Sequence, residues 1–533
     1  MKLHPLFLTA ATLGLPAVTL AQGLPALDLD LVPLGTYESG LFDESAAEIV
    51  AHDPNSLRLF IVNAFANSID VVSIADPSNP TLVSTVDMSP YGGGLTSIDV
   101  GRGKVAGLGG VAYQPVVAVA VKADPETDPG MAVFLDTDGN FLSSVQVGYL
   151  PDMITFTPSG NYVLTANEGQ PSDDYTIDPV GSISVIDVSG LITGIQQSDV
   201  RDAGFEAFNG GVPGVRVFGP GATLAQDMEP EYIAVSKNSR RAYVACQENN
   251  ALAIVDIQNA TVIDIKPLGT KDHSLAGNEL DPSNQDGGIN IQSWPVKGFY
   301  MPDTIKSFRT PSGDFLITAN EGDSRDYGGY SEEERIKDLL LDPVAFPDAA
   351  FLQANENLGR LKTTTANGDT DGDGDYDELY SYGARSFSIW DLDGNLVFDS
   401  GAQFEQLIAQ YEPAEFNSTN DENGSFDNRS DDKGPEPEGV EIGRLYGRRV
   451  AFVGFERHSA IVAYDCTIPS APAFIGYFSN RDFTGDAAAG TAGDLGPEGM
   501  LFIPQGQSPT GTPLLVVGNE VSGTTTVWEI QKL

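Results

Sequence analysis

Residues 230–249 read PEYIAVSKNSRRAYVACQEN, and this phrase recurs with variations along the chain. Pro and an acidic residue open a short apolar strand, a polar turn follows, and a second apolar strand ends in Asn-Glu or a close relative. Related copies begin at Pro151, Pro302, Pro437 and Pro497. A supersecondary unit that repeats in this way is typical of repeat architectures, because each copy buries its apolar face only against its neighbours.

The repeats predict an all-β fold. Short runs rich in Val, Ile and Phe, such as 59–62 and 183–186, are separated by turn sequences such as Asp-Gly-Asn at 138–140. A repeated four-stranded unit of about 40–50 residues is a propeller blade. We therefore predict a seven-bladed β-propeller, in preference to a pair of β-sandwiches, with blades that begin near residues 44, 95, 148, 227, 300, 436 and 496. A strand over 29–34 is expected to complete the last blade.

The blade sequences leave several long polar segments unused. Residues 22–533 are expected to form a single propeller domain with acidic loop insertions near 201–226, 267–299, 324–384 and 400–435. One helix is predicted over 331–341, because Glu332, Glu333 and Glu334 would lie in its first turn, where the helix dipole favours acids.

The N-terminus predicts export. Residues 1–21 are typical of a secretory signal peptide, with Lys2 before a mostly apolar run and small residues around Ala21. That run is too short and too interrupted to span a bilayer, and no later stretch is long enough. We expect a secreted protein, periplasmic or extracellular, with no membrane span.

The charge balance excludes some partners. The chain has 75 Asp and Glu residues against 29 Lys and Arg, a formal net charge of −46. Nucleic acid and anionic membrane surfaces are therefore not expected as partners, because both require dense positive charge. The excess of acids has two interpretations: solubility in a salty or mineral-rich exterior, or cation binding.

The acidic residues of the repeated phrases are predicted to lie close together. The innermost strand of each blade lines the central channel, so the acids that open these strands should form a ring at one mouth, and those of the Asn-Glu phrases a second ring. The first ring would hold Asp152, Glu231, Asp303, Glu438 and Glu498, and the second Glu168, Glu248, Glu321, Glu456 and Glu520. Converging carboxylates stay ionised only if cations or arginines neutralise them. Asp152, Glu231, Asp303 and Glu321 are thus candidate ligands of a hard cation; the alternative is that each acid caps the turn of its own blade.

A local calcium motif stands in the longest insertion. Residues 369–378 read DTDGDGDYDE, with Asp369, Asp371 and Asp373 at positions one, three and five and Gly at position six. This spacing is typical of an EF-type calcium loop. Tyr380 occupies the twelfth position, where such loops carry Glu, so Asp375 and Glu378 are the further ligands predicted. The alternative is a solvated acidic linker.

Mixed-charge phrases suggest phosphate chemistry. Residues 429–439 read RSDDKGPEPEG and lead into Glu438. Arginine recognises phosphate through two parallel hydrogen bonds, and carboxylates hold metals that polarise a phosphoryl oxygen. Arg429 and Arg385 are therefore candidate phosphate-binding residues, and Glu438 and Glu498 candidate catalytic metal ligands. Structural pairing of these arginines with neighbouring acids is the alternative.

Together these phrases resemble the choice-of-anchor I family, secreted propeller proteins often labelled alkaline-phosphatase-like, and the chain is also similar to the mesenchyme-specific cell surface glycoprotein family. The resemblance covers roughly residues 30–530 and rests on the segments 151–153, 166–169, 230–233, 247–251, 319–323, 383–389, 429–439 and 496–499. It implies a propeller and calcium, and a link of some relatives to biomineralisation. Family members often carry a C-terminal anchor, and we expect none after the final strand, over 524–530.

Two functional hypotheses follow. The first is a secreted calcium-binding propeller that hydrolyses phosphomonoesters in a metal-dependent way at its acidic channel mouth, with calcium and a second hard cation as cofactors. The second is a non-catalytic extracellular matrix or biomineral-interaction protein that binds calcium through the same acids.

Overall fold

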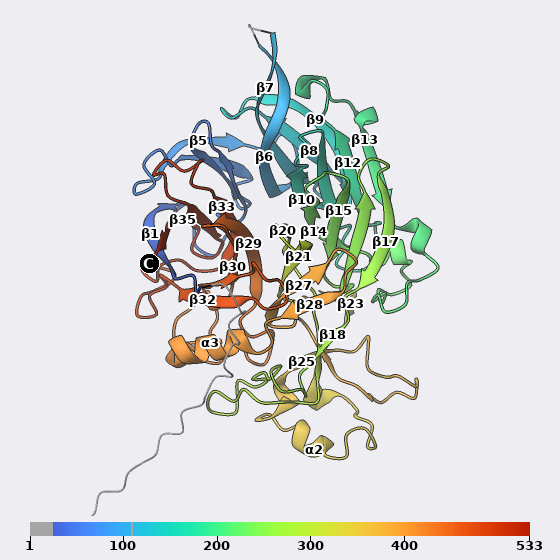
Figure 1. The fold of residues 1–533 in the computed structure, drawn as a ribbon. Helices are drawn as coiled ribbons and strands as arrows, with labels where there is room; N and C mark the ends of the chain where they lie inside the picture. The colour runs from blue at the N-terminus through green and yellow to red at the C-terminus, as the bar shows by residue number, and fades with distance from the viewer. Residues whose placement is uncertain (1–24, 108–109) are drawn as a thin grey trace, which may run out of the picture.

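The computed structural model describes residues 25–107 and 110–533 (Figure 1). The predicted signal peptide at 1–21 lies outside the described residues. The described residues form seven four-stranded antiparallel sheets, which follow one another along the chain. The first three comprise β2 (Val50–Asp53), β3 (Arg58–Asn63), β4 (Ser68–Ser73) and β5 (Thr81–Asp87); β6 (Gly94–Gly107), β7 (Gly110–Lys122), β8 (Pro129–Leu135) and β9 (Phe141–Tyr149); and β10 (Pro151–Phe156), β11 (Tyr162–Asn167), β12 (Ser182–Asp187) and β13 (Val200–Gly204).

The other four sheets continue the same pattern. They comprise β14 (Pro230–Val235), β15 (Arg241–Cys246), β16 (Ala251–Asp256) and β17 (Thr261–Pro267); β20 (Ile305–Thr310), β21 (Gly313–Asn320), β27 (Ser386–Asp391) and β28 (Leu396–Asp399); β29 (Pro437–Leu445), β30 (Arg448–Phe455), β31 (Ala460–Asp465) and β32 (Ala473–Phe478); and β33 (Pro497–Ile503), β34 (Leu514–Asn519), β35 (Thr524–Lys532) and β1 (Leu29–Glu38).

The first strands of successive sheets contact one another in a closed cycle. β2 contacts β6, β6 contacts β10, and the series continues through β14, β20, β29 and β33 back to β2. In Figure 1 these strands lie nearest the centre of the ring, with β5, β13 and β17 toward its rim. This arrangement is a β-propeller, and the all-β prediction is confirmed.

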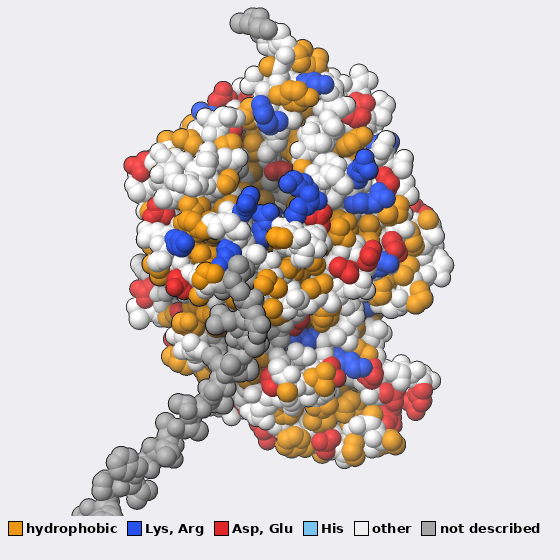
Figure 2. All heavy atoms as spheres, in the orientation of Figure 1, with side chains coloured by type: hydrophobic (Ala, Val, Ile, Leu, Met, Phe, Trp, Pro, Cys, Tyr) orange, Lys and Arg blue, Asp and Glu red, His pale blue; other side chains and the backbone are white. Residues whose placement is uncertain are grey.

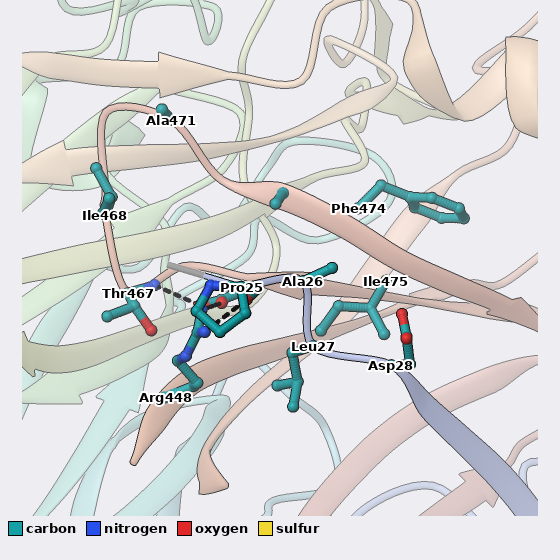
Figure 3. A pocket seen from close by; sticks show the side chains of 12 residues that line it. Pro25, Ala26, Leu27, Asp28, Arg448, Thr467, Ile468, Ala471, Phe474 and Ile475 are labelled. Carbon is teal, nitrogen blue, oxygen red and sulfur yellow. Dashed lines mark hydrogen bonds and ion pairs between the residues drawn. The ribbon is translucent and has the colours of Figure 1, made fainter. Parts of the chain in front are cut away.

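The N-terminal strand completes the seventh sheet. β1 pairs antiparallel with β35, so that Leu29 lies opposite Lys532. The preceding residues lie beside the sixth sheet, where the Arg448 guanidinium donates to the carbonyl oxygen of Pro25 at 2.7 Å. Figure 3 shows these residues around a small cavity of about 100 Å³. The predicted closing strand over 29–34 is therefore present and longer than expected.

The core is divided among the contacts between neighbouring sheets. One cluster, for example, joins Val163 and Ile186 of the third sheet to Ala118 and Phe134 of the second. Further clusters of the same kind lie between the other neighbouring pairs. Because each sheet is covered on both faces, its middle strands are continuous apolar runs, as in 59–62.

Two of the predicted insertions fold together. Residues from 267–299 and 324–384 share a small core that includes Trp294, Ile336 and Leu358, and this unit lies below the ring in Figure 1. Its elements are β18 (Thr270–Asp272), β19 (Lys297–Phe299), β22 (Asp326–Tyr327), β23 (Tyr330–Ser331), β24 (Glu333–Arg335), β25 (Lys362–Thr364), β26 (Tyr380–Ser381) and α2 (Ala349–Leu352), with 3-10 turns at Ile336–Asp338 and Leu358–Arg360.

The helix prediction over 331–341 is wrong. That segment contains the end of β23, β24 and a 3-10 turn, because the Glu332 carboxylate is buried against Arg216 and β24 pairs with β25. The longest helix of the described residues is instead α3 (Gln403–Tyr411), which buries Phe404, Leu407 and Ile408. The other helical turns are α1 (Leu224–Asp227) and the 3-10 turns Ile192–Gly194, Gln197–Asp199, Glu206–Phe208 and Pro413–Glu415.

Candidate metal centre

A β-bulge places the acid of most repeated phrases. The pairing of first and second strands shifts register at Pro151/Met153, Pro230/Ile233, Pro437/Val440 and Pro497/Met500. The acids Asp152, Glu231, Glu438 and Glu498 lie within these shifts. A bulge turns a side chain away from the regular alternation of a strand, and Pro suits the first position of a strand because it has no N–H to donate. The phrase therefore combines a strand start with a redirected carboxylate.

The residue before the Pro of several phrases has a left-handed backbone. The φ angles are 44° at Leu150, 43° at Met301 and 51° at Glu436, and Gly496 takes 72° in the seventh sheet. Residues other than Gly adopt this conformation at a cost, and such positions cluster at functional sites. The same local strain thus accompanies the acids in several sheets.

Two glycines bring neighbouring sheets into close contact at this level. A Cβ on Gly439 would lie 2.3 Å from the carbonyl oxygen of Glu498, and a Cβ on Gly499 would lie 2.3 Å from that of Glu48. These separations leave no room for a side chain. The Pro-Glu-Gly phrases therefore set Glu438 beside Glu498, and Glu498 beside Glu48.

The first predicted ring converges as expected, and Glu48 joins it. Burial raises the pKa of Glu498 well above its usual range, and repulsion from Glu48 and Glu520 adds to the shift. Burial likewise raises the pKa of Glu438, with repulsion from Glu456 and Glu321. The same two causes raise the pKa values of Glu231 and Asp303 strongly and that of Glu48 to about 8. Burial alone raises the pKa of Asp152, to about 6, against the attraction of Lys122. Glu48 was missed as a ring member because its phrase, Ala47-Glu48-Ile49, lacks the Pro.

The two predicted rings are interleaved rather than separate. One oxygen each of Glu168, Glu231 and Glu248 lie within 4.8 Å of one another, between the third and fourth sheets; we call these three residues the open group. Glu168 and Glu248 are each 4% exposed. Burial and mutual repulsion raise the pKa values of all three well above the usual range of a carboxylate.

Several carboxylate oxygens at this mouth have no hydrogen-bond partner. They are the buried Oε2 atoms of Glu231, Glu248, Glu438 and Glu498. Nearly all buried polar atoms in proteins find a partner, and each exception calls for a specific cause. Converging carboxylate oxygens are the ligands that hard cations prefer, so these residues fit a calcium-type ion.

A second group of three carboxylates lies between the fifth and sixth sheets. Oxygens of Glu321, Glu436 and Glu456 also lie within 4.8 Å of one another, and we call them the paired group. Lys433 Nζ lies 2.7 Å from Glu321, Arg429 Nη2 2.7 Å from Glu436, and Arg457 lies 3.1 Å from both Glu436 and Glu456. Burial alone would raise the pKa of Glu436, but these three bases lower it to about 2.

The two predicted phosphate-binding arginines are already engaged. Arg429 pairs with Glu436 and Asp432 at the edge of the paired group. Arg385 is 5% exposed, pairs with Glu405 at 2.6 Å, and donates to the carbonyl oxygens of Asp281, Ser430 and Asp432. These contacts fit a structural role for Arg385, which is the alternative that the sequence left open.

The calcium-type loop has the turns expected of it. The Asp369 carboxylate accepts the backbone N–H groups of Gly372 at 2.7 Å and Gly374 at 3.1 Å. Oxygens of Asp369, Asp371 and Asp377 lie within 4.8 Å of one another, and Asp375 forms a similar group with Asp342 and Asp377.

One predicted ligand of this loop has other partners in the structure. Glu378 pairs with Lys297 at 2.7 Å and accepts the Tyr380 hydroxyl, so it points to partners outside the aspartate cluster. Asp377, which the prediction left out, lies in both groups of three, and Glu378 stays a predicted ligand. Asp373 belongs to neither group of three, although its carboxylate accepts the backbone N–H of Asp375.

Within the described residues, no helix has the length and apolar character needed to cross a membrane. Among solved structures, the chain is similar in shape to Kuenenia stuttgartiensis hydrazine synthase (TM-score 0.45, 12% identity, covering 92% of this chain and 99% of that one) and to the WD40 domain of Toxoplasma gondii coronin (TM-score 0.44, 8% identity, 96% and 89%). Likenesses this distant say nothing about function.

Sequence comparison gives a nearer relationship. The chain is 31% identical over 276 residues to the mesenchyme-specific cell surface glycoprotein of Strongylocentrotus purpuratus, a match that covers 45% of this chain and 35% of the relative. It is 33% identical over 195 residues to gigasin-3a of Magallana gigas, covering 34% and 68%. It thus spans only about a third of the length of the sea-urchin relative. The family model for the choice-of-anchor I domain matches residues 48–469, most of the propeller, and the chain therefore belongs to the choice-of-anchor I family.

Proposed function

We propose that this protein is an extracellular calcium-binding propeller whose principal cation site is the open group, Glu168, Glu231 and Glu248. The observation that carries the proposal is the unpaired, buried Oε2 of Glu248 beside that of Glu231. Calcium binds carboxylate oxygens at about 2.3–2.6 Å, so ligand atoms within 4.8 Å of one another can share one ion.

The electrostatics of the mouth support a cation. An unneutralised buried carboxylate costs several kcal/mol, so the open group is either protonated or bound to positive charge. Arg325 is the nearest base with a described ion pair, but its guanidinium is held by Asp227 and Glu229. A divalent ion would allow all three carboxylates to ionise together.

A non-catalytic role at the cell surface or in an extracellular matrix follows from the same site. It draws support from the name of the sea-urchin relative, a cell surface glycoprotein. In this role the 369–378 loop supplies a second, exposed calcium site through Asp369, Asp371 and Asp377.

The test is a calcium titration by calorimetry on metal-free protein. The double variant, Glu231→Gln with Glu248→Gln, keeps the shape of the open group and removes two charges. It should therefore bind one calcium ion fewer per protein molecule than the parent. The matched control is Glu356→Gln, an exposed acid of the insertion, which should titrate like the parent. A parent that binds no calcium, or a double variant with the full stoichiometry, would refute the site.

Phosphomonoester hydrolysis is the second candidate. It is supported by Arg457, whose side chain is 31% exposed, beside Lys433 and the ring acids, so that positive charge and carboxylates meet at one mouth. A hard cation bound there would polarise a phosphoryl oxygen, Glu438 and Glu498 would hold it, and Arg457 and Arg429 would bind the phosphate.

This second function is tested with p-nitrophenyl phosphate in the presence and absence of calcium. Glu438→Gln should lower kcat strongly, whereas Arg457→Gln should weaken substrate and transition-state binding together. Absence of turnover in calcium-loaded protein, across several phosphomonoesters, would leave the calcium-binding role alone.

A further inference from the structure

The face opposite the acidic mouth carries a cluster of basic residues. Each first strand begins at the acids and runs to a turn on this far face, and several of these turns are rich in Lys and Arg. We define the basic face as Arg102, Lys104, Lys237, Arg240, Arg309, Arg444 and Arg449. Figure 2 shows Lys and Arg side chains gathered near the middle of one face, below the β6–β7 hairpin.

Most of these bases lack an acidic partner. Arg102, Arg240 and Arg444 are exposed, and none of them has a carboxylate within 4.0 Å among the described residues. Elsewhere in the described chain, most Lys and Arg residues are ion-paired, as expected where acids outnumber bases by 75 to 29. Acids of this face are bound to other bases, as Asp256 is to Arg241 and Asp465 to Arg448, and leave Arg102, Arg240 and Arg444 without a carboxylate partner.

Two arginines face each other directly. Arg444 and Arg449 are cross-strand partners in the β29–β30 hairpin, and like charges placed opposite one another are destabilising. Arg449 is held in place by donating its Nε–H to the carbonyl oxygen of Arg309 at 2.6 Å. Neither arginine has an acidic partner among the described residues, so an anionic ligand would relieve their repulsion.

Two adjoining hollows connect the bases into a groove. A hollow of about 330 Å³ is lined by Lys237, Arg309 and Arg449, with Asp314 its one carboxylate. The next, of about 520 Å³, is lined by Arg102 and Tyr113, with Asp99 its one carboxylate. Pro158 belongs to both hollows, so the groove runs from the β6–β7 hairpin across to the sixth sheet.

The groove also offers surfaces for a sugar ring. The Tyr113 ring is 54% exposed and carries Lys104 Nζ at 5.7 Å from its centroid. The hydroxyl residues Ser236 and Ser307 line the same groove. Exposed aromatic rings beside hydroxyls and guanidinium groups suit a ligand that is polar, ring-shaped and anionic.

We propose that the basic face binds an acidic polysaccharide through its carboxylate or sulfate groups. Guanidinium groups bind both anions through paired hydrogen bonds, and each of the two adjoining hollows offers at least one such group. Nucleic acid is the less favoured polyanion, because duplex DNA carries a charge about every 1.7 Å and the field of a chain with net charge −46 opposes such density. The proposal does not depend on the cation site at the opposite mouth.

The test measures binding of fluorescent polygalacturonate and heparin at low salt, with neutral dextran as the negative probe. Both anionic chains should bind, dextran should not, and affinity should fall at least tenfold as salt rises into the physiological range. Arg444→Gln with Arg449→Gln should weaken binding at least tenfold.

The matched control removes the same charge elsewhere. Lys337 and Arg201 are exposed bases outside the groove and without an ion pair among the described residues. Lys337→Gln with Arg201→Gln should change affinity less than twofold, and circular dichroism should show both double variants folded. The proposal is overturned if the anionic polysaccharides fail to bind at low salt, or if both double variants lose affinity equally. It is also overturned if a DNA duplex binds more tightly than the polysaccharides, or if ultracentrifugation shows that the parent protein self-associates and that Arg444→Gln with Arg449→Gln abolishes this association.

Discussion

The open group and the paired group solve the same electrostatic problem differently. Each brings three carboxylates of neighbouring sheets within 4.8 Å of one another. In the paired group, Lys433, Arg429 and Arg457 hold the pKa of Glu436 at about 2, although burial still raises the pKa of Glu321 and that of Glu456 to about 8. In the open group, no base lies within ion-pair distance among the described residues, and the pKa values rise instead. The chain supplies neutralising bases to the paired group, whereas we propose that a bound cation neutralises the open group.

Removing Lys433 should make the paired group resemble the open group, and this is the largest effect that we expect. Lys433→Met leaves Glu321 and Glu436 without their ammonium partner, and unpairing a buried charge costs about 3–5 kcal/mol. Urea unfolding in a chelator should show this loss. Calcium should restore much of it, with one additional ion bound in calorimetry.

The control for this experiment is Lys337→Met, which removes an exposed Lys of the insertion. It should leave both stability and stoichiometry unchanged. A Lys433→Met protein that is as stable as the parent without calcium would show that the two groups are not equivalent.

The pH dependence should report the buried acids of the mouth. Burial raises the pKa of Asp152 to about 6, and burial with repulsion from neighbouring carboxylates raises the pKa values of Glu48 and Glu456 to about 8. Raised carboxyl pKa values mean that the folded state binds protons more tightly than the unfolded state. The free energy of unfolding of metal-free protein should therefore fall as pH rises from about 4.5 to 8.

Calcium should flatten that fall, because it binds the ionised carboxylates. Glu436 has the opposite sign: its lowered pKa adds stability above about pH 4.5, which is lost as pH falls toward 2. Thermal melts from pH 4 to 9, with calcium and with chelator, measure both effects. Parallel melting curves in the two conditions would argue against a cation at the open group.

A smaller effect is expected from a substitution at Gly499, where the chain closely approaches the backbone of Glu48. Gly499→Ala would place a methyl group 2.3 Å from the carbonyl oxygen of Glu48, and such overpacking typically costs about 1–3 kcal/mol. It should also weaken calcium binding by moving Glu498 away from Glu48. Gly506→Ala is the control, since nothing lies within 4 Å of the place that its Cβ would occupy.

The smallest effect is expected at the exposed loop. Asp369→Ala with Asp371→Ala should abolish the part of the calcium-dependent rise in melting temperature that this loop contributes by mass action. Glu378→Gln, which breaks only an exposed pair with Lys297, should keep that rise. Equal calcium responses in all three proteins would show that the loop is an acidic linker.

Features that recur in the repeated phrases could be predicted from the sequence. Features that depend on a single long-range contact could not. The propeller and the convergence of Asp152, Glu231 and Glu498 followed from phrases that recur with a Pro and a bulge. Glu436 could not be recognised, because its place in the paired group depends on a left-handed backbone and on Lys433 and Arg457.

Two contacts that the sequence did not reveal have the same origin. The helix expected over 331–341 is replaced by extended chain because Glu332 meets Arg216, a residue far away in sequence. Glu378, which spacing assigned to calcium, forms an ion pair with Lys297 of another insertion. Long-range ion pairs override local propensity in both places, and no local pattern reveals them.

The seventh sheet determines how early during synthesis Glu498 can be held against Glu48. β1 lies near the beginning of the chain and β33, β34 and β35 at its end, so this sheet forms only when nearly all 533 residues are available. At typical rates of synthesis that takes roughly half a minute or longer. Until then Glu498 is not held against Glu48, and these two carboxylates remain separate and hydrated. The repulsion between the first and seventh sheets is thus postponed until the ring closes, and if the mouth binds calcium as we propose, the calcium supply of the compartment where this occurs should affect how easily the ring closes.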